Sequence, residues 1–210
     1  TKCVAGKYIV YLPTTKATHD ISFWRKDFDM HHALSRTGIS KCVICPSGKY
    51  ALEGSSICES CPAGKHIDDS GVDASKHVNA GSCKTCLKGK WSNEAQHICN
   101  DCLPGTMLGD DGTDPKYHDG IEDCEVCNSG KYSEGNANHQ CTNCVKGKYL
   151  LDHKNNRLLH DQSSSDCMTC KSGEYSPVDG STVCTACGKG KYLADNGASG
   201  SAAAHNAESK

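Results

Sequence analysis

Residues 83–107 read CKTCLKGKWSNEAQHICNDCLPGTM and contain the pattern that governs the chain twice in succession. Each copy is a Cys-x-x-Cys pair, two variable residues, a glycine, one further residue and then a bulky side chain. The chain has 210 residues and 17 cysteines, and all but one of these cysteines fall in such pairs. The pairs are Cys42/Cys45, Cys58/Cys61, Cys83/Cys86, Cys99/Cys102, Cys124/Cys127, Cys141/Cys144, Cys167/Cys170 and Cys184/Cys187. A small unit repeated at a regular period predicts a tandem array.

The gaps between successive pairs alternate between short ones of 12 or 13 residues and long ones of 21 or 22 residues. We call the segments that span these gaps short units and long units. The lone Cys3 is followed by Gly6, Lys7 and Tyr8, the same signature, so we expect it to be the second cysteine of a pair that begins before Thr1. We expect further repeats on both sides. The expected segments are a first long unit at 1–41, repeats at 42–82, 83–123 and 124–166, and a repeat at 167–210 that is truncated before its next cysteine.

The composition agrees with a disulfide scaffold. Cysteine is common, glycine reaches 21 residues, and there are only two Phe and two Trp. A chain this polar cannot bury one large hydrophobic core, so its folded structure has to be stabilised by many local disulfides. A net charge of -2 gives no reason to expect nucleic acid or an anionic membrane as a partner. This segment contains no apolar run of transmembrane length, and no cofactor is expected.

Six of the eight tyrosines stand five residues after the second cysteine of a pair. These are Tyr8, Tyr50, Tyr132, Tyr149, Tyr175 and Tyr192, and the same position holds His66, Trp91 and Met107 in the remaining units. The glycine before them predicts a tight turn, and we expect the large side chain to cover a disulfide. A ladder of aromatic rings that binds a ligand is the alternative. The predicted fold class is small and disulfide-rich, an elongated tandem array of short two-stranded β units with little helix.

Two further features stand out. His77, His118, His160 and His205 recur near the ends of the long units, which predicts a structural contact, such as a hydrogen bond to the neighbouring unit. Residues 9–41 carry an insertion with Phe23, Trp24 and Phe28, where apolar mass is concentrated. We interpret this insertion either as a short amphipathic helix that covers its own unit or as a contact with a partner.

The cysteine spacing also fits four-cysteine zinc sites. The unbroken chain of linked units and the Ser/Gly/Asp-rich surface favour oxidised cystines instead, so no metal site is predicted. Asp68-Asp69, Asp110-Asp111 and Asp114 could hold calcium, but they lack the pattern of a dedicated loop and are interpreted as solvated turns.

Counting cysteines leaves two disulfide schemes open. In the first, the second cysteine of each pair bonds the first cysteine of the next pair, and each unit closes on itself. In the second, adjacent pairs cross-bond, as in Cys42–Cys58 and Cys45–Cys61. Each scheme makes eight bonds and leaves one cysteine over, Cys187 in the first and Cys3 in the second.

The stretch Cys45-Pro-Ser-Gly-Lys-Tyr50, closed by Cys58, resembles the first module of tumour-necrosis-factor-receptor cysteine-rich domains. The whole train of Cys-x-x-Cys-x-x-Gly-Lys-Tyr repeats resembles ephrin-receptor-like cysteine-rich repeats, as in large surface proteins of protists and algae. This resemblance implies an extracellular or cell-surface location and favours the first disulfide scheme. That scheme gives Cys3–Cys42, Cys45–Cys58, Cys61–Cys83, Cys86–Cys99, Cys102–Cys124, Cys127–Cys141, Cys144–Cys167 and Cys170–Cys184, with Cys187 unpaired.

No arrangement of catalytic side chains stands out from the repeats, so we do not expect an enzyme. The preferred hypothesis is an extracellular structural protein, a stiff disulfide-stapled rod in a filament, appendage or cell-surface stalk. It would self-associate or stack on neighbouring repeats of a longer chain. The alternative is an adhesion or receptor-type ectodomain that binds a protein or glycan ligand, with Phe23, Trp24 and Phe28 as its contact. The chain has no Asn-x-Ser/Thr site for N-glycosylation, and O-linked sugars stay open.

Overall fold

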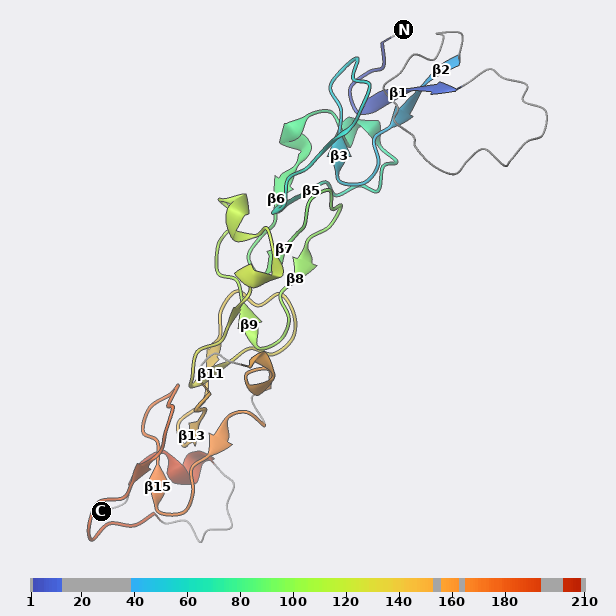
Figure 1. Ribbon diagram of the computed structural model, residues 1–210. Coiled ribbons are helices and arrows are strands. Elements are labelled where there is room, and N and C mark those ends of the chain that lie inside the picture. The colour runs from blue at the N-terminus through green and yellow to red at the C-terminus, as the bar shows by residue number, and fades with distance from the viewer. Residues whose placement is uncertain (1, 13–38, 153–155, 163–164, 194–201, 209–210) are drawn as a thin grey trace, which may run out of the picture. The chain divides into compact units, whose positions relative to one another are not determined.

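The computed structural model describes residues 2–12, 39–152, 156–162, 165–193 and 202–208 (Figure 1). The described chain divides into two compact units. The first contains residues 1–61 and 67–83, and the second contains residues 62–66 and 84–210. The predicted segmentation at residues 42, 83, 124 and 167 is not tested by this division and stays a prediction.

Every strand in the described residues belongs to a two-stranded antiparallel sheet. In the first compact unit, β1 (Lys7–Leu12) pairs with β2 (Ile39–Ile44), and β3 (Lys49–Tyr50) pairs with β4 (Glu59–Ser60). The second compact unit contains the pairs β5 (Lys65–His66) with β6 (Lys84–Thr85), β7 (Lys90–Trp91) with β8 (Asn100–Asp101), β9 (Thr106–Met107) with β10 (Glu125–Val126), β11 (Lys131–Tyr132) with β12 (Thr142–Asn143), β13 (Lys148–Tyr149) with β14 (Met168–Thr169), and β15 (Glu174–Tyr175) with β16 (Thr185–Ala186). The fold is small, disulfide-rich and mostly β, as the sequence predicts.

The sequence signature explains these ribbons residue by residue. From β3 onward, the first strand of each pair is the residue after the turn glycine together with the bulky residue that follows it. The second strand is formed by the two residues inside the next Cys-x-x-Cys pair. Because the two cysteines of that pair flank the strand, one of them closes the finished unit and the other begins the next. No separate linker therefore joins successive units.

Short 3-10 helices occupy the long units. They are η2 (Ala74–Lys76), η3 (Ala80–Ser82), η4 (Pro115–Tyr117), η5 (Ile121–Asp123), η6 (Arg157–Leu159) and η7 (Ala202–His205). The starts of η2, η4 and η6 are capped by the side chains of Asp73, Asp114 and Asn156, each of which accepts from the backbone N–H of the second residue of its helix. These caps fix the entry to the histidine that follows each helix. The amphipathic helix expected near Phe23 and Phe28 lies outside the described residues.

The core is a series of small clusters around cystines. Cys61 and Cys83 pack with Ile67, and the half-buried Tyr50 of the preceding short unit covers them. The second compact unit repeats this arrangement twice, with Trp91 over Cys102, Leu108 and Cys124, and with Tyr132 over Cys144, Leu150 and Cys167. In these three short units the bulky ring covers a disulfide, as predicted, but the disulfide is that of the following long unit. Each miniature core is shared between two units.

Candidate functional site

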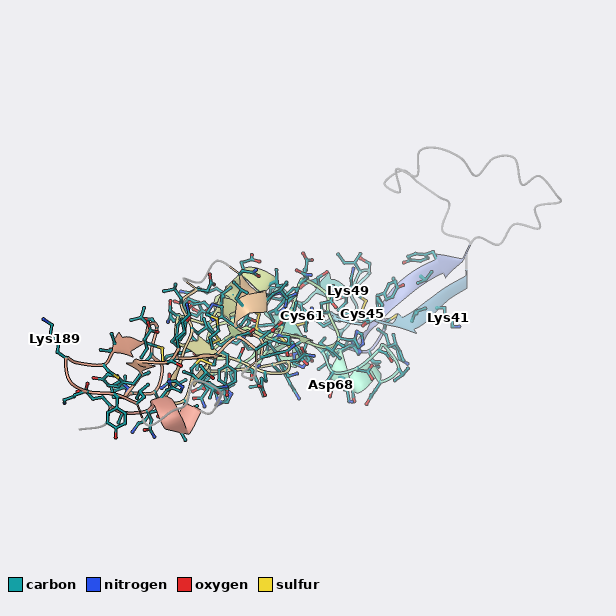
Figure 2. All side chains as sticks on the ribbon, turned by 90° about the horizontal axis from the view of Figure 1, so that it is seen from below. Lys41, Cys45, Lys49, Cys61, Asp68 and Lys189 are labelled. Atoms are coloured by element: carbon teal, nitrogen blue, oxygen red, sulfur yellow. A yellow bond between two sulfur atoms is a disulfide. The ribbon has the colours of Figure 1, made fainter. Side chains whose placement is uncertain are left out.

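The structure joins the cysteines in eight disulfides, shown in yellow in Figure 2. The bonds are Cys3–Cys42, Cys45–Cys58, Cys61–Cys83, Cys86–Cys99, Cys102–Cys124, Cys127–Cys141, Cys144–Cys167 and Cys170–Cys184. Each bond closes one unit, and Cys187 is free and half-buried. Three of the bonds join cysteines that are 22 or 23 residues apart and close long units, and both cysteines of each of these bonds are buried. In the short units the second cysteine of the bond is only half-buried, which applies to Cys58, Cys99, Cys141 and Cys184.

This pattern makes a direct prediction for the protein in solution. We expect the unreduced protein to have the mass of a chain with eight disulfides and to take up one alkylating group, at Cys187. Peptide mapping by mass spectrometry should link Cys45 to Cys58 and Cys102 to Cys124. Peptides that link Cys42 to Cys58 instead would establish the crossed scheme, and full-mass free thiols with bound zinc would contradict the disulfide fold itself.

The four recurring histidines are buried at the junctions between units. The residues His77, His118 and His160 are 0% exposed, and His205 is 2% exposed. The ring of His118 places Nδ1 at 2.7 Å from the Lys90 carbonyl oxygen, on strand β7 of the preceding short unit. Its Nε2 lies 2.8 Å from a carboxylate oxygen of Asp110, and its backbone carbonyl accepts a hydrogen bond from the Ser92 N–H at 2.9 Å. One histidine therefore ties the end of its long unit to both its own loop and the short unit before it.

The same junction recurs with different residues. His160 contacts the Lys131 carbonyl oxygen at 2.7 Å and Asp152 at 2.9 Å, and it accepts from Ser133. His77 contacts the Lys49 carbonyl oxygen and Asp69 within the first compact unit and accepts from the Ala51 N–H. His205 lies in the corresponding position, because its Nδ1 contacts the Glu174 carbonyl oxygen and its own carbonyl accepts from the Ser176 N–H. The structural contact expected of the histidine series is thus present in every described long unit that carries one.

The aspartates of these junctions are hydrogen-bonded carboxylates rather than solvated turns. Asp69 accepts from the backbone N–H groups of Gly71, Val72 and Asp73 at 2.9, 2.9 and 3.1 Å, in addition to the bond with His77. The hydrogen bond from His77 is the largest cause that holds the pKa of Asp69 well below its usual value, and the backbone donors add to it. The pKa of Asp110 is lowered chiefly by the hydrogen bond with His118.

A second feature of the junction was not predicted. The residue after the bulky position is buried in every described unit from Ala51 onward, and its size alternates. Short units carry a small residue, and long units carry a large aliphatic one. The small residues are Ala51, Ser92, Ser133 and Ser176, and the large ones are Ile67, Leu108, Leu150 and Leu193. This alternation is visible in the sequence, for example as Tyr132-Ser133 in a short unit and Tyr149-Leu150 in a long unit. In the long unit, the aspartate that contacts the histidine stands two residues after the buried leucine, as Asp152 does after Leu150.

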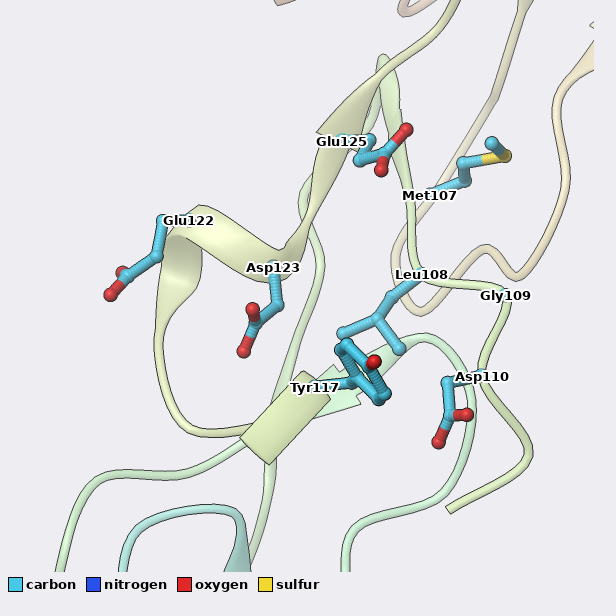
Figure 3. A pocket seen from close by; sticks show the side chains of 8 residues that line it. All are labelled: Met107, Leu108, Gly109, Asp110, Tyr117, Glu122, Asp123 and Glu125. Carbon is cyan, nitrogen blue, oxygen red and sulfur yellow. The ribbon is translucent and has the colours of Figure 1, made fainter. Parts of the chain in front are cut away.

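Two other places could hold a ligand. His66 Nδ1 lies 3.1 Å from the Cys99 sulfur, but Cys99 is bonded to Cys86, so neither sulfur is a thiolate that could bind a metal. An open hollow of about 380 Å³ lies on the long unit between Cys102 and Cys124 (Figure 3). It is lined by Met107, Leu108, Gly109, Asp110, Tyr117, Glu122, Asp123 and Glu125. The suggested partner contact at Phe23, Trp24 and Phe28 lies outside the described residues.

Comparison with known proteins supports the repeat assignment. Residues 159–203 match the sequence family described as tyrosine-protein kinase ephrin type A/B receptor-like. No curated protein matches the chain. Together with the cystine series, the match shows tandem cysteine-rich repeats similar to those of receptor ectodomains, which indicates a non-catalytic domain and an extracellular or secreted location. In the described part of the chain no helix has the length and apolar character needed to cross a membrane.

Proposed function

We propose that these cysteine-rich repeats form a stiff, disulfide-stapled structural segment in the extracellular part of a receptor-type surface protein. The segment would serve as a rod in a stalk, filament or appendage and hold other parts of the protein away from the cell. The observation that carries this proposal is the repeated junction, in which a buried histidine and two backbone hydrogen bonds tie the long units of His118 and His160 to the short units before them.

The junctions restrict bending in a way that linked globular domains do not. The Gly105 N–H donates to the Ser133 carbonyl oxygen at 2.9 Å, and the Ser133 hydroxyl donates back to the Thr106 carbonyl oxygen at 2.9 Å. The shared cores and the absence of a linker add to these bonds. Arrays built from such nearest-neighbour interfaces transmit stiffness from one unit to the next.

Small-angle X-ray scattering of the unreduced protein tests the rod. A globular chain of this length has a radius of gyration of about 17 Å and an unfolded chain one of about 50 Å. We expect a value near twice the globular one, together with a linear cross-section Guinier region, because a stiff rod has a constant cross-section. A reduced and alkylated sample is the control and should lose the cross-section region. A radius near 17 Å for the unreduced protein would refute the rod.

A ligand-binding ectodomain is the second candidate, because the matched family is named for receptors. Its contact would be the aromatic insertion with Phe23, Trp24 and Phe28, and its ligand a protein or glycan. We expect saturable binding to cells or glycan arrays that Trp24→Ala abolishes, with Trp91→Tyr as the control that leaves the insertion intact. Concentration-dependent self-association in sedimentation experiments, unchanged by Trp24→Ala, would favour the structural role instead.

A further inference from the structure

The buried rings of His77, His118 and His160 are each held between two hydrogen-bond acceptors. On one side of the His118 ring, Nδ1 faces the carbonyl oxygen of Lys90, which can only accept, so Nδ1 must carry a proton. On the other side, Nε2 faces a carboxylate oxygen of Asp110. The rings of His77 and His160 have the same two neighbours, a backbone carbonyl and an aspartate.

The surroundings of the aspartates decide where the second proton lies. The Asp69 oxygen that faces His77 also accepts three backbone N–H groups, and the Asp110 oxygen that faces His118 also accepts the Gly112 N–H at 2.9 Å. Donors directed at a carboxyl oxygen favour its ionised form. An ionised carboxylate can only accept, so Nε2 must donate as well. A ring that donates from both nitrogens carries two protons and a positive charge, and the His118 side chain is 0% exposed.

We infer that the junctions of His77, His118 and His160 are proton-dependent clips, in which a buried imidazolium–carboxylate pair binds a long unit to the short unit before it while the ring is doubly protonated. When the pH rises and the ring gives up a proton, a nitrogen lone pair faces the carboxylate at 2.8 Å in the His118 junction. That contact is repulsive, and the unpaired carboxylate has lost its strongest donor. The clip then opens, and the two units are held together by the remaining backbone bonds and by the covalent chain.

The other charged groups near the His118 junction do not replace Asp110. Asp114 and Lys116, on the helix before His118, form their own ion pair at 3.2 Å. The ammonium group of Lys90, whose carbonyl contacts the ring, pairs with Asp101, and Lys88 lies 3.7 Å from Asp111. In the described residues around this ring, Asp110 is the carboxylate that forms a hydrogen bond with it. The same holds for Asp69 at His77, where Asp73 caps η2 and Lys76 reaches the Asp68 carbonyl.

The aspartates of the clip respond to pH in the opposite direction from the histidines. Because the pKa values of Asp69 and Asp110 are lowered in the folded protein, their contribution is fully present above the ordinary carboxyl pKa near 4. It is lost only as the pH falls through the depressed values of the folded state. The carboxylates of these two clips therefore stay ionised in mildly acidic surroundings.

Nuclear magnetic resonance of the unreduced full chain, labelled with ¹⁵N at histidine, tests the clip. We expect His118 and His160 to show two protonated ring nitrogens at neutral pH. We also expect the protection of the Ser92 and Ser133 amides, corrected for the intrinsic exchange rate, to fall by about tenfold or more as each ring loses its second proton. A ring with one protonated nitrogen at neutral pH would overturn the proposal, as would protection that does not change when the proton leaves.

A pair of variants separates the clip from a general charge effect. Asp110→Asn keeps the shape of the side chain but removes the carboxylate, so no imidazolium–carboxylate pair can form at this junction. We expect the Ser92 amide to lose its pH dependence in this variant, while the Ser133 amide keeps it. Asp114→Asn is the matched control, because it removes the same charge at the cap of η4 without touching the ring. Equal effects of the two variants on Ser92 would overturn the proposal. Neither substitution removes the disulfides Cys86–Cys99 and Cys102–Cys124, which close the two units of this junction.

Discussion

Gly105→Ala should destabilise the array far more than Gly135→Ala, although both glycines have a positive φ. The angles are +82° at Gly105 and +73° at Gly135, so both substitutions incur the cost of a left-handed alanine, about 1 to 2 kcal/mol. A Cβ at Gly105 would also lie 2.0 Å from the carbonyl oxygen of Arg157, in the next long unit, whereas a Cβ at Gly135 meets no described atom within 4 Å. The backbone of η6 would have to move, which should add about 2 kcal/mol or more.

Amide hydrogen exchange measures this loss of stability at the affected junction. The Gly105 N–H is bonded to Ser133 and the Cys127 N–H to the Gly105 carbonyl, so both amides report on the affected junction. Their protection should collapse in Gly105→Ala and change little in Gly135→Ala. Similar losses in the two variants would mean that the turn conformation alone, and not the contact between long units, requires glycine at residue 105.

Removal of the Cys102–Cys124 disulfide by a double substitution to serine should cost more than the same removal of Cys127–Cys141. The bonds join residues 22 and 14 positions apart, so the chain-entropy term is about 3 kcal/mol for each. The difference comes from the core. Cys102 and Cys124 are buried with Leu108 under Trp91, and two serines there leave hydroxyls in an apolar cluster. We expect an additional loss of about 1 to 3 kcal/mol for the buried pair.

Thermal unfolding followed by circular dichroism, with the other seven disulfides intact, measures this comparison. The melting temperature should fall further for the Cys102/Cys124 variant than for the Cys127/Cys141 variant. A larger fall for the Cys127/Cys141 variant would show that the shared cores under the rings add little to the array.

The sequence predicted the features that are set within one unit. Cysteine spacing predicted the repeated units, the resemblance to ephrin-receptor-like repeats favoured the closure of each unit on itself, and Gly-Lys-Tyr predicted a turn followed by a short ribbon, as in residues 48–50 and their partners. These features depend on local closure and turn geometry, which a short stretch of chain determines. The position of the histidine contact was also visible, because the register of His118 and His160 is regular.

Apart from the histidine contact, the features that lie between units were not predicted. The Tyr50 ring covers the disulfide of the following unit, and whether Ser92 or Leu108 fits at the buried position depends on the space that the neighbour leaves. Asp110 looked like a loop residue because its partner, His118, is brought to it only when the long unit folds back. Such contacts require knowledge of how the units pack, and a single sequence does not provide it.

The alternation of small and large buried residues has a consequence for how such a chain can change in length. A duplication or deletion of one unit would bring two residues of the same class next to each other, with a leucine in the space that fits Ser92 or a serine in the space that Leu108 fills. A change of one short and one long unit together keeps the alternation. Viable insertions and losses should therefore come in steps of 41 to 43 residues, the spacing of Cys42, Cys83, Cys124 and Cys167, and related chains should differ by whole multiples of this step.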